Sequence, residues 1–289
     1  MKFTNILFPV DFSERCRAVA PFVSAVAKRD GASLTLVHVV EPSVMWYGAV
    51  ETTCVPEMDL ARLIAAAEHR LVFFADESFS GMDTNTRVES GDPAACIIDV
   101  TRSSGVDLIM MPTRGRGRFR AALLGSVTSK VLHDAACPVW TAAHSDEPGG
   151  GYSAQWRKIV CALDTTDDAL RLIHCAHDLN ASNGASIHLV HAVPAPAEAG
   201  LEKYLDHDFE LFLKDSARNA ISVMQKETGT DFPLCVETGK ISSVVAAVAQ
   251  RDEADLVLIG RGVLPRVAGG FRTHVYAIIR DVPCPVLSI

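Results

Sequence analysis

The stretch GASLTLVHVV at residues 31–40 recurs as GASIHLVHAV at residues 184–193. Upstream of each copy, at the same spacing, ILFPVD at residues 6–11 recurs as IVCALD at residues 159–164. Three further blocks follow in one order: VESG, VDLIMM and CPV in the first half, and VETG, ADLVLI and CPV in the second. Five matching blocks in the same order indicate an internal repeat.

The segment between the two repeats has the composition of a linker. It contains DEPGGGYS, in which a proline is followed by three glycines in polar surroundings, a pattern typical of a flexible connection. We therefore expect one domain at residues 1–145, a linker at 146–156 and a second domain at 157–289.

Strands and helices are expected to alternate along the first repeat. Apolar, β-branched runs predict strands at residues 6–10, 33–40, 84–89, 106–111 and 138–142. Ser13 is placed to cap the first helix and Gly31 to end it, while Pro21 predicts either a kink or a later start. Asp92 and Pro93 are typical of another helix start, and residues 126–134 of a last helix. The pattern predicts an α/β fold with two tandem doubly wound, Rossmann-like parallel sheets of five strands each.

Sheets of this kind bind ligands at the carboxyl ends of their strands, near the switch in strand order. This rule points to Asp11, to Val39 and to the loop that follows Met111. Several features give this loop the composition of a phosphate cradle: its glycines, Arg114 and Arg116 as mobile positive charge, and the helix N-terminus with the hydroxyl of Ser126. The plainer interpretation is a helix start preceded by a solvated basic loop.

The bulk composition excludes several classes of function. A net charge of −8 argues against a general nucleic-acid binder, and no apolar run approaches the length of a membrane span. No secretory signal precedes the first strand, so we expect a cytoplasmic protein whose eight cysteines, none in a CxxC pair, are reduced. The P-loop, GxSxG and HExxH motifs are missing, so no catalytic or metal-binding residue is assigned.

The spacing of Gly115, nine intervening residues and Gly125-Ser126 resembles the nucleotide loop of the universal stress protein family. The FPVDFS segment at residues 8–13, LVHV at 36–39 and the ACPV ending at 136–139 are also similar to that family. The resemblance covers both repeats. It implies an adenine nucleotide α-hydrolase-like fold that binds ATP or ADP, with or without Mg²⁺.

The resemblance also implies a role for each matching residue. The backbone around Pro9 and Val39 would hold the adenine and Asp11 the ribose. The triphosphate would run past Met111, Arg114 and Gly115 to phosphate contacts at Gly125, Ser126 and Val127.

Two departures from the family pattern bear on this expectation. Pro112 stands at the family's first loop glycine and offers no N–H group, so we expect nucleotide binding to persist with lowered or altered affinity. In the second repeat, Gly260 begins the motif, but Arg272-Thr273, or Gly269-Gly270 in a shifted register, stands where Gly125-Ser126 would recur. The second site is therefore interpreted as degenerate, although Asp164 is retained.

The resemblance implies a stress-response switch or sensor without fast catalysis, compatible with slow ATP hydrolysis. Two alternatives stay open: a nucleotide-using enzyme that forms AMP, and an interaction module with a vestigial pocket. The two repeats are expected to form an internal pseudo-dimer in which residues 138–142 pair with residues 285–289. A homodimer of the whole chain is compatible with the same resemblance.

Overall fold

The computed structural model describes residues 1–289 except 42–56, 116–123, 144–153, 167, 194–206 and 262–270. The described residues fall into two compact units. One unit holds residues 2–140 and Ala154, and the other holds residues 155–289 together with Met1 and residues 141–143. Each unit therefore contains most of one sequence repeat.

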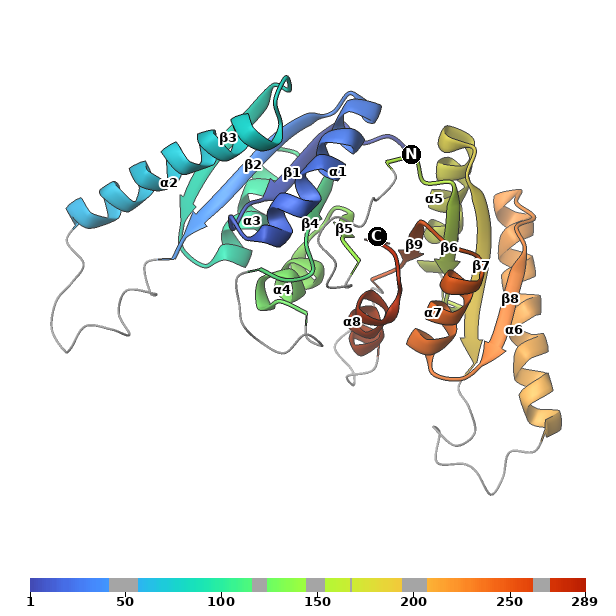
Figure 1. Ribbon diagram of the computed structural model, residues 1–289. Helices are drawn as coiled ribbons and strands as arrows, with labels where there is room; N and C mark the ends of the chain where they lie inside the picture. The colour runs from blue at the N-terminus through green and yellow to red at the C-terminus, as the bar shows by residue number, and fades with distance from the viewer. Residues whose placement is uncertain (42–56, 116–123, 144–153, 167, 194–206, 262–270) are drawn as a thin grey trace, which may run out of the picture. The chain divides into compact units, whose positions relative to one another are not determined.

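The elements of the two repeats are drawn in Figure 1. The first repeat contains β1 (Asn5–Pro9), α1 (Glu14–Asp30), β2 (Ser33–Val40), α2 (Glu57–Ser78), β3 (Thr84–Ser90), α3 (Pro93–Ser103), β4 (Leu108–Met111), α4 (Ser126–Asp134) and β5 (Val139–Thr141). The second contains β6 (Lys158–Ala162), α5 (Asp168–Asn183), β7 (Ser186–Val193), α6 (His207–Thr228), β8 (Leu234–Thr238), α7 (Ile241–Arg251), β9 (Leu256–Ile259), α8 (Phe271–Asp281) and β10 (Val286–Ser288).

The strands of each repeat are ordered as in a doubly wound sheet. The order in the first repeat is β3-β2-β1-β4-β5, and β1 pairs in parallel with both β2 and β4. The second repeat has the corresponding order β8-β7-β6-β9-β10, with β6 parallel to β7 and β9. In both, the order reverses beside the first strand, which places the topological switch point between β1 and β4 in the first repeat.

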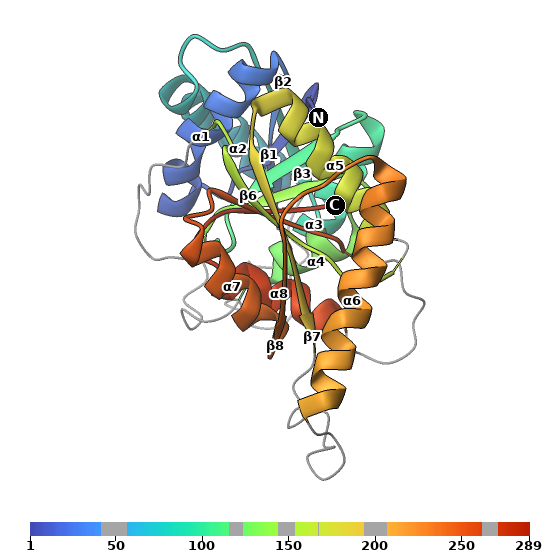
Figure 2. The same cartoon turned by 90° about the vertical axis from the view of Figure 1, so that its right-hand side faces the viewer.

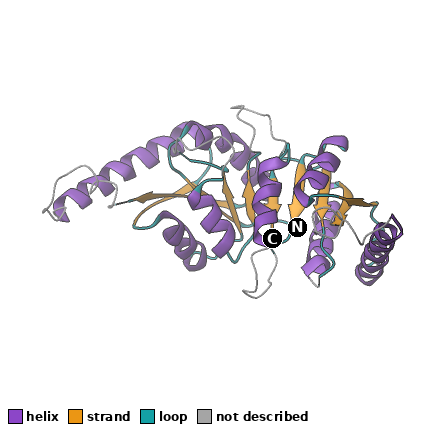
Figure 3. Cartoon of the chain, turned by 90° about the horizontal axis from the view of Figure 1, so that it is seen from below, coloured by secondary structure: helices purple, strands orange, loops and turns teal. Residues whose placement is uncertain are grey.

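Helices cover both faces of each sheet, as Figure 3 shows. In the first repeat α1 packs on α2, and α3 packs on α4. In the second repeat α5 packs on α6 and α7 on α8, and Figure 2 shows α6 and α7 on opposite sides of β7 and β8. The α/β fold class with two tandem parallel sheets is thus confirmed.

The central strands are buried because helices lie over both of their faces. Ile6, Leu7 and Phe8 of β1 and all four residues of β4 are almost inaccessible to solvent. A continuous apolar run, rather than an alternating one, is what such a strand requires. The rigid sheet that results holds the carboxyl ends of β1 and β4 in fixed positions.

The ends of the first helix follow the expected capping pattern. The Ser13 side chain accepts a hydrogen bond from the Cys16 amide, and Gly31 adopts φ 66° at the C-cap. The later start suggested by Pro21 is wrong, because α1 begins at Glu14 and Pro21 lies within it. The Ser13 cap and the buried face of α1 outweigh the loss of one backbone hydrogen bond.

The fourth strand is shorter than expected and begins at Leu108. The reason lies in Asp107, whose carboxylate accepts hydrogen bonds from the Thr4 and Asn5 amides at 2.7 and 2.9 Å. Asp255 makes the corresponding contacts with the Arg157 and Lys158 amides in the second repeat. In each repeat a carboxylate fixes the start of the first strand.

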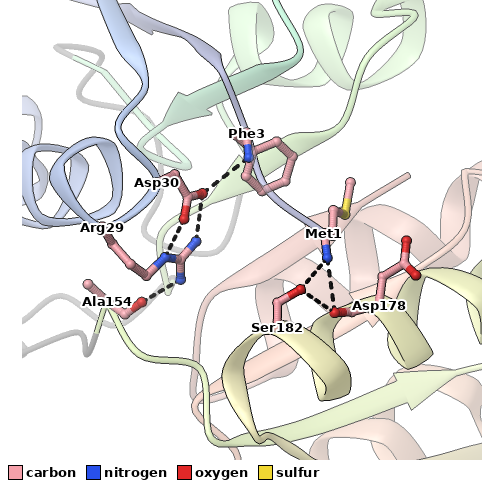
Figure 4. A network of polar contacts seen from close by, with 7 residues as sticks. All are labelled: Met1, Phe3, Arg29, Asp30, Ala154, Asp178 and Ser182. Carbon is pink, nitrogen blue, oxygen red and sulfur yellow. Dashed lines mark hydrogen bonds and ion pairs between the residues drawn. The ribbon is translucent and has the colours of Figure 1, made fainter.

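Polar contacts also fix the start of the chain, as Figure 4 shows. In the unit of the first repeat, the buried Asp30 carboxylate accepts a hydrogen bond from the Phe3 amide and forms an ion pair with Arg29. The Arg29 guanidinium also donates a hydrogen bond to the Ala154 carbonyl. In the other unit, the Met1 amino group donates to the Asp178 carbonyl at 2.9 Å.

Replacement of Asp30 by alanine is expected to lower the free energy of unfolding by about 2 kcal/mol, because charge-assisted hydrogen bonds to a buried carboxylate are lost. Asp76→Ala is the matched control, since Asp76 is exposed on α2 and should change the free energy by less than about 0.5 kcal/mol. Urea denaturation of the two variants measures both values. Equal effects would show that the Asp30 contacts do not stabilise the fold.

Candidate functional site

The residues singled out by the sequence gather at the carboxyl edge of the first sheet. Pro9 ends β1, Met111 ends β4 and Val39 lies one residue before the end of β2. Pro112 follows β4 directly, and Asp11 lies two residues after the end of β1. Because these strands are parallel, their carboxyl ends share one edge, at the switch point where this class of sheet binds ligands.

The turn from β1 to α1 orients the Asp11 side chain. The Val10 carbonyl accepts a hydrogen bond from the ring Nδ1–H of His38 at 2.6 Å. The Val10 amide donates a hydrogen bond to the Val37 carbonyl at 2.7 Å. Asp11 Oδ1 then accepts from the Ser13 amide at 2.9 Å. With one carboxylate oxygen held by this turn, the other is directed across the edge toward the loop after β4.

Gly115 lies directly against that second oxygen. A Cβ atom built on Gly115 would stand 2.4 Å from Asp11 Oδ2, which is closer than two such atoms can approach. The φ angle of Gly115 is outside the left-handed region, so a side chain here would be opposed by the Asp11 carboxylate, which would have to move, and not by the backbone conformation. The contact brings the two strand-end segments together at one point.

Two hydrogen bonds close the base of the loop between β4 and α4. The Gly125 amide donates to the Thr113 carbonyl at 2.9 Å, and the Thr128 hydroxyl donates to the Pro112 carbonyl at 3.2 Å. Residues 116–123, which include Arg116, lie outside the described residues. The described ends of the loop, residues 112–115 and 124–125, therefore lie together beside α4.

The N-terminus of α4 faces this edge without a side-chain cap. Gly125 is the N-cap residue and contributes no side-chain hydrogen bond. The first amides of a helix have no acceptor within the helix and carry partial positive charge, so those of Ser126 and Val127 are suited to an anion. The Gly125 amide is already used by Thr113, which limits the amides available to a phosphate to those that follow it.

Arg114 differs from the mobile, solvated arginine that the loop composition suggested. Its relative exposure is 6%, so it belongs to the packed base of the loop. A Cβ built on Gly125 would lie 3.4 Å from the Arg114 Cα atom, which shows how closely the start of α4 covers this residue. A buried guanidinium is a fixed charge, so Arg114 contributes local positive potential rather than a flexible contact.

Pro112 is also buried, and its carbonyl oxygen accepts the Thr128 hydroxyl. The residue therefore anchors α4 to the end of β4 through its acceptor group, although it has no donor to offer a ligand.

The second repeat keeps part of this arrangement. Asp164 Oδ1 accepts hydrogen bonds from both the amide and the hydroxyl of Thr166, at 3.0 and 2.6 Å. His191 Nδ1 contacts the Leu163 carbonyl at 2.9 Å, as His38 contacts Val10. Val263, which stands where Gly115 does, lies outside the described residues, and no side chain is described for Arg272 or Thr273.

The backbone conformation of Phe12 is a feature of the site that the sequence did not predict. This residue follows Asp11 and has a φ of 60°, and its ring lies 4.5 Å from that of His38. Bulky residues rarely adopt positive φ, so no local sequence pattern predicts left-handed backbone at a phenylalanine. The recurrence of histidine at 38 and 191 was a usable signal, since both rings hold the carbonyl that precedes the site aspartate.

The described residues contain neither a cluster of metal-binding side chains nor a helix that could span a membrane. No three histidine, cysteine, aspartate or glutamate side chains within them lie close enough together to hold a metal ion. Among the helices that they form, none is both long and apolar enough to cross a membrane.

Comparison with known proteins identifies the family. The family model for universal stress proteins matches residues 2–142 and, a second time, residues 155–289. The chain belongs to the universal stress protein family. Its two repeats are thus two universal stress protein domains in tandem.

The similarity to individual universal stress proteins extends over one repeat. One from Thermus aquaticus is 30% identical over 139 residues, which cover 47% of this chain and 96% of that protein. Another, from Mycolicibacterium smegmatis, is 27% identical over 146 residues, covering 50% of this chain and 49% of that protein.

Solved structures of universal stress proteins match the fold over the whole chain. A crystal structure from Archaeoglobus fulgidus has a TM-score of 0.69 at 18% identity and covers 100% of this chain and 98% of its own. A putative universal stress protein from Pseudomonas aeruginosa has a TM-score of 0.62 at 18% identity, with coverage of 99% and 93%. At these identities the match supports the fold alone.

Proposed function

We propose that the first repeat binds an adenine nucleotide, ATP or ADP, and that the chain acts as a nucleotide-dependent switch or sensor without fast catalysis. The observation that carries this proposal is the contact of Gly115 with Asp11 beside the glycine-capped N-terminus of α4. A carboxylate and a set of free helix amides at one sheet edge suit a ligand with hydroxyl groups at one end and phosphates at the other.

Each part of the nucleotide has a suitable counterpart at this edge. The Ser126 and Val127 amides would bind phosphate oxygens, with the Ser126 hydroxyl as a further donor. Asp11 would accept hydrogen bonds from the ribose hydroxyls, and the backbone of Pro9 and Val39 would hold the adenine. Mg²⁺, where present, would be coordinated largely by the phosphates themselves.

The proposed switch role is based on the two segments of the chain that the nucleotide would contact at the same time. Ribose contacts would act on the turn between β1 and α1, and phosphate contacts on the start of α4. Nucleotide binding would therefore stabilise one arrangement of these two segments over others. No residue at this edge is assigned as a general base, so turnover of ATP would be slow.

The organisation of the chain is part of the same proposal. We place the domains at residues 1–145 and 157–289, with a linker at 146–156 whose last residue, Trp156, is fully buried. The internal pseudo-dimer through the two final strands, a homodimer of the chain and a cytoplasmic location remain proposals. Sedimentation analysis with and without MgATP tests the homodimer.

Calorimetric titration with MgATP tests the proposed function. The Gly125→Arg variant introduces at the α4 N-cap the residue type found at Arg272, and its side chain would occupy the space over the first-turn amides. We expect affinity to fall about 30-fold, or about 2 kcal/mol. Gly125→Ala is the matched control. Its Cβ would lie 3.3 Å from the Thr113 carbonyl oxygen, which is a tight contact without overlap, and the φ of −63° suits alanine. We expect the affinity of this variant to stay within about threefold of that of the unmodified chain.

Three outcomes would contradict the proposal. No heat of binding from the unmodified chain at millimolar MgATP would leave an interaction module with a vestigial pocket as the better interpretation. Rapid formation of AMP with a co-substrate would favour the nucleotide-using enzyme. Equal affinities of the two Gly125 variants would place the nucleotide away from α4.

A further inference from the structure

The helix α2 exposes large apolar side chains on the face that points away from its sheet. Val72 is 48% exposed and Phe73 is 67% exposed, the highest value among the large apolar side chains that the structure describes. The opposite face of α2 lies over β2 and β3 (Figure 1), and there Leu71 and Phe74 are buried. The core of the domain therefore does not account for Val72 and Phe73, and adjacent exposed apolar residues of this size are typical of an interaction surface.

Seven residues of α2 share this outward face, which we call the outer stripe. Their spacing of three or four residues places them in one line along a helix. All are exposed: Arg62, Ala65, Ala66, His69, Val72, Phe73 and Asp76. The outer stripe thus combines two large apolar residues, two small ones and one charge of each sign.

The outer stripe is complementary to itself about His69. When two α2 helices from two copies of the chain pack antiparallel, with a two-fold axis beside His69, positions equally far before and after it lie level with each other. Arg62 and Asp76 are each seven positions from His69, so each arginine would lie level with an aspartate of the second copy.

The apolar residues of the outer stripe match in the same register. Val72 and Phe73 are three and four positions after His69, and Ala66 and Ala65 are three and four positions before it. The large side chains of one helix would therefore enter the space that the small side chains of the other leave open, as close packing of two helices requires.

The two charges of the outer stripe are available for contacts with a second copy. Within the described residues Arg62 and Asp76 make no ion pair, whereas Arg17 and Glu77 beside them pair with each other at 2.6 Å. A parallel pair of α2 helices would place like charges level with each other, which is unfavourable. Charge complementarity therefore selects the antiparallel arrangement.

The corresponding helix of the second repeat lacks this complementarity. Both α2 and α6 contain 22 residues, and α6 begins 150 residues after α2. The positions of Arg62 and Asp76 are occupied in α6 by Phe212 and Lys226. An antiparallel pair of α6 helices would thus place an apolar residue level with a cation, so the self-complementary surface is specific to the first repeat.

We propose that the outer stripe of α2 is the surface through which two copies of the chain associate, antiparallel about His69. The inference goes beyond the proposed function, because it assigns a surface to the homodimer and does not depend on nucleotide binding. One helix from each copy buries less than the roughly 1,200 Å² of a stable complex, so we expect a dissociation constant of about 100 µM. At a few micromolar, where denaturation is measured, the chain is then monomeric, and Phe73 and Asp76 are exposed as described.

A charge-exchange experiment tests the proposed interface. Arg62→Glu and Asp76→Arg each place like charges level with each other at two points of the dimer, and each variant is expected to weaken association about tenfold. The double variant restores opposite charges and should associate within about threefold of the unmodified chain. Sedimentation equilibrium from about 10 to 500 µM brackets the expected constant and measures all four.

Two further variants separate the interface from general charge and apolar effects. Phe73→Ala is expected to weaken association at least about tenfold, because a central aromatic side chain is lost from both copies. Arg171→Glu is the matched control, since Arg171 is exposed on α5 and the substitution changes the net charge as Arg62→Glu does. Its association should stay within about twofold of that of the unmodified chain. Circular dichroism confirms that every variant is folded.

A chain that remains monomeric at 500 µM overturns the inference and leaves the outer stripe to a different partner. A dimer that the two single charge variants leave intact also overturns it, because the interface then lies elsewhere on the chain. Association of the double variant as weak as that of the single variants would exclude the pairing of Arg62 with Asp76. None of these measurements contains MgATP, so failure of this inference and failure of the proposed function are distinguishable.

Discussion

Replacement of Gly115 by valine is expected to weaken MgATP binding at least about 100-fold, or about 2.7 kcal/mol. A Cβ atom at this position would stand 2.4 Å from Asp11 Oδ2, so the carboxylate would have to turn away from the site. The branched side chain would also fill space at the sheet edge that the proposed nucleotide occupies. Calorimetric titration measures the loss, and valine is the residue that the second repeat has at this place.

Gly260→Ala is the matched control for this variant. Gly260 follows β9 as Pro112 follows β4, and a Cβ there would meet the end of the flexible Leu172 side chain at 3.0 Å. We expect MgATP binding to stay within about twofold of the unmodified chain. If Gly115→Val binds as tightly as the control, the contact between Gly115 and Asp11 does not shape the nucleotide site.

Replacement of Phe8 by alanine is expected to lower the free energy of unfolding of the first domain by about 3–5 kcal/mol. Phe8 is fully buried in the central strand β1, and its ring packs edge-on against Phe79 with 6.0 Å between centroids. Removal of the ring loses its burial and leaves a cavity that a sheet covered on both faces cannot close. Urea denaturation followed by circular dichroism measures the change.

Phe73→Ala provides the comparison, because Phe73 is 67% exposed on α2. A change below about 0.5 kcal/mol is expected for this variant. A loss for Phe8→Ala no larger than that of Phe73→Ala would contradict the assignment of β1 to the core.

Most of the fold could be predicted because its signals are local or repeated. Residues 33–40 and 126–134 were predicted as the structure has them, since apolar composition and capping coincide there. The start of α1 was ambiguous because Pro21 and Ser13 give opposing signals, and only the packing of the helix decides between them. The start of β4 depends on Asp107 reaching the Thr4 amide, a long-range contact that no local window contains.

The candidate site was predictable in its members but not in how they are arranged. Parallel strands necessarily bring Asp11 and the end of β4 to one edge, so topology alone placed them. The burial of Arg114 and the use of the Gly125 amide by Thr113 depend on how residues 113–114 pack against the start of α4, which composition does not encode. The left-handed Phe12 has ring contacts with His38 and Arg70, which come from elements distant in the sequence, so no local pattern contains them.

The most direct test is to follow the backbone amides of the first repeat by NMR while MgATP is added. The account predicts that the Gly115, Ser126 and Val127 amides shift on binding, that the Gly125 amide shifts less because Thr113 accepts it, and that the residues around Asp164 do not respond. Shifts confined to the second repeat, or the absence of shifts at Ser126 and Val127 under saturating MgATP, would contradict it.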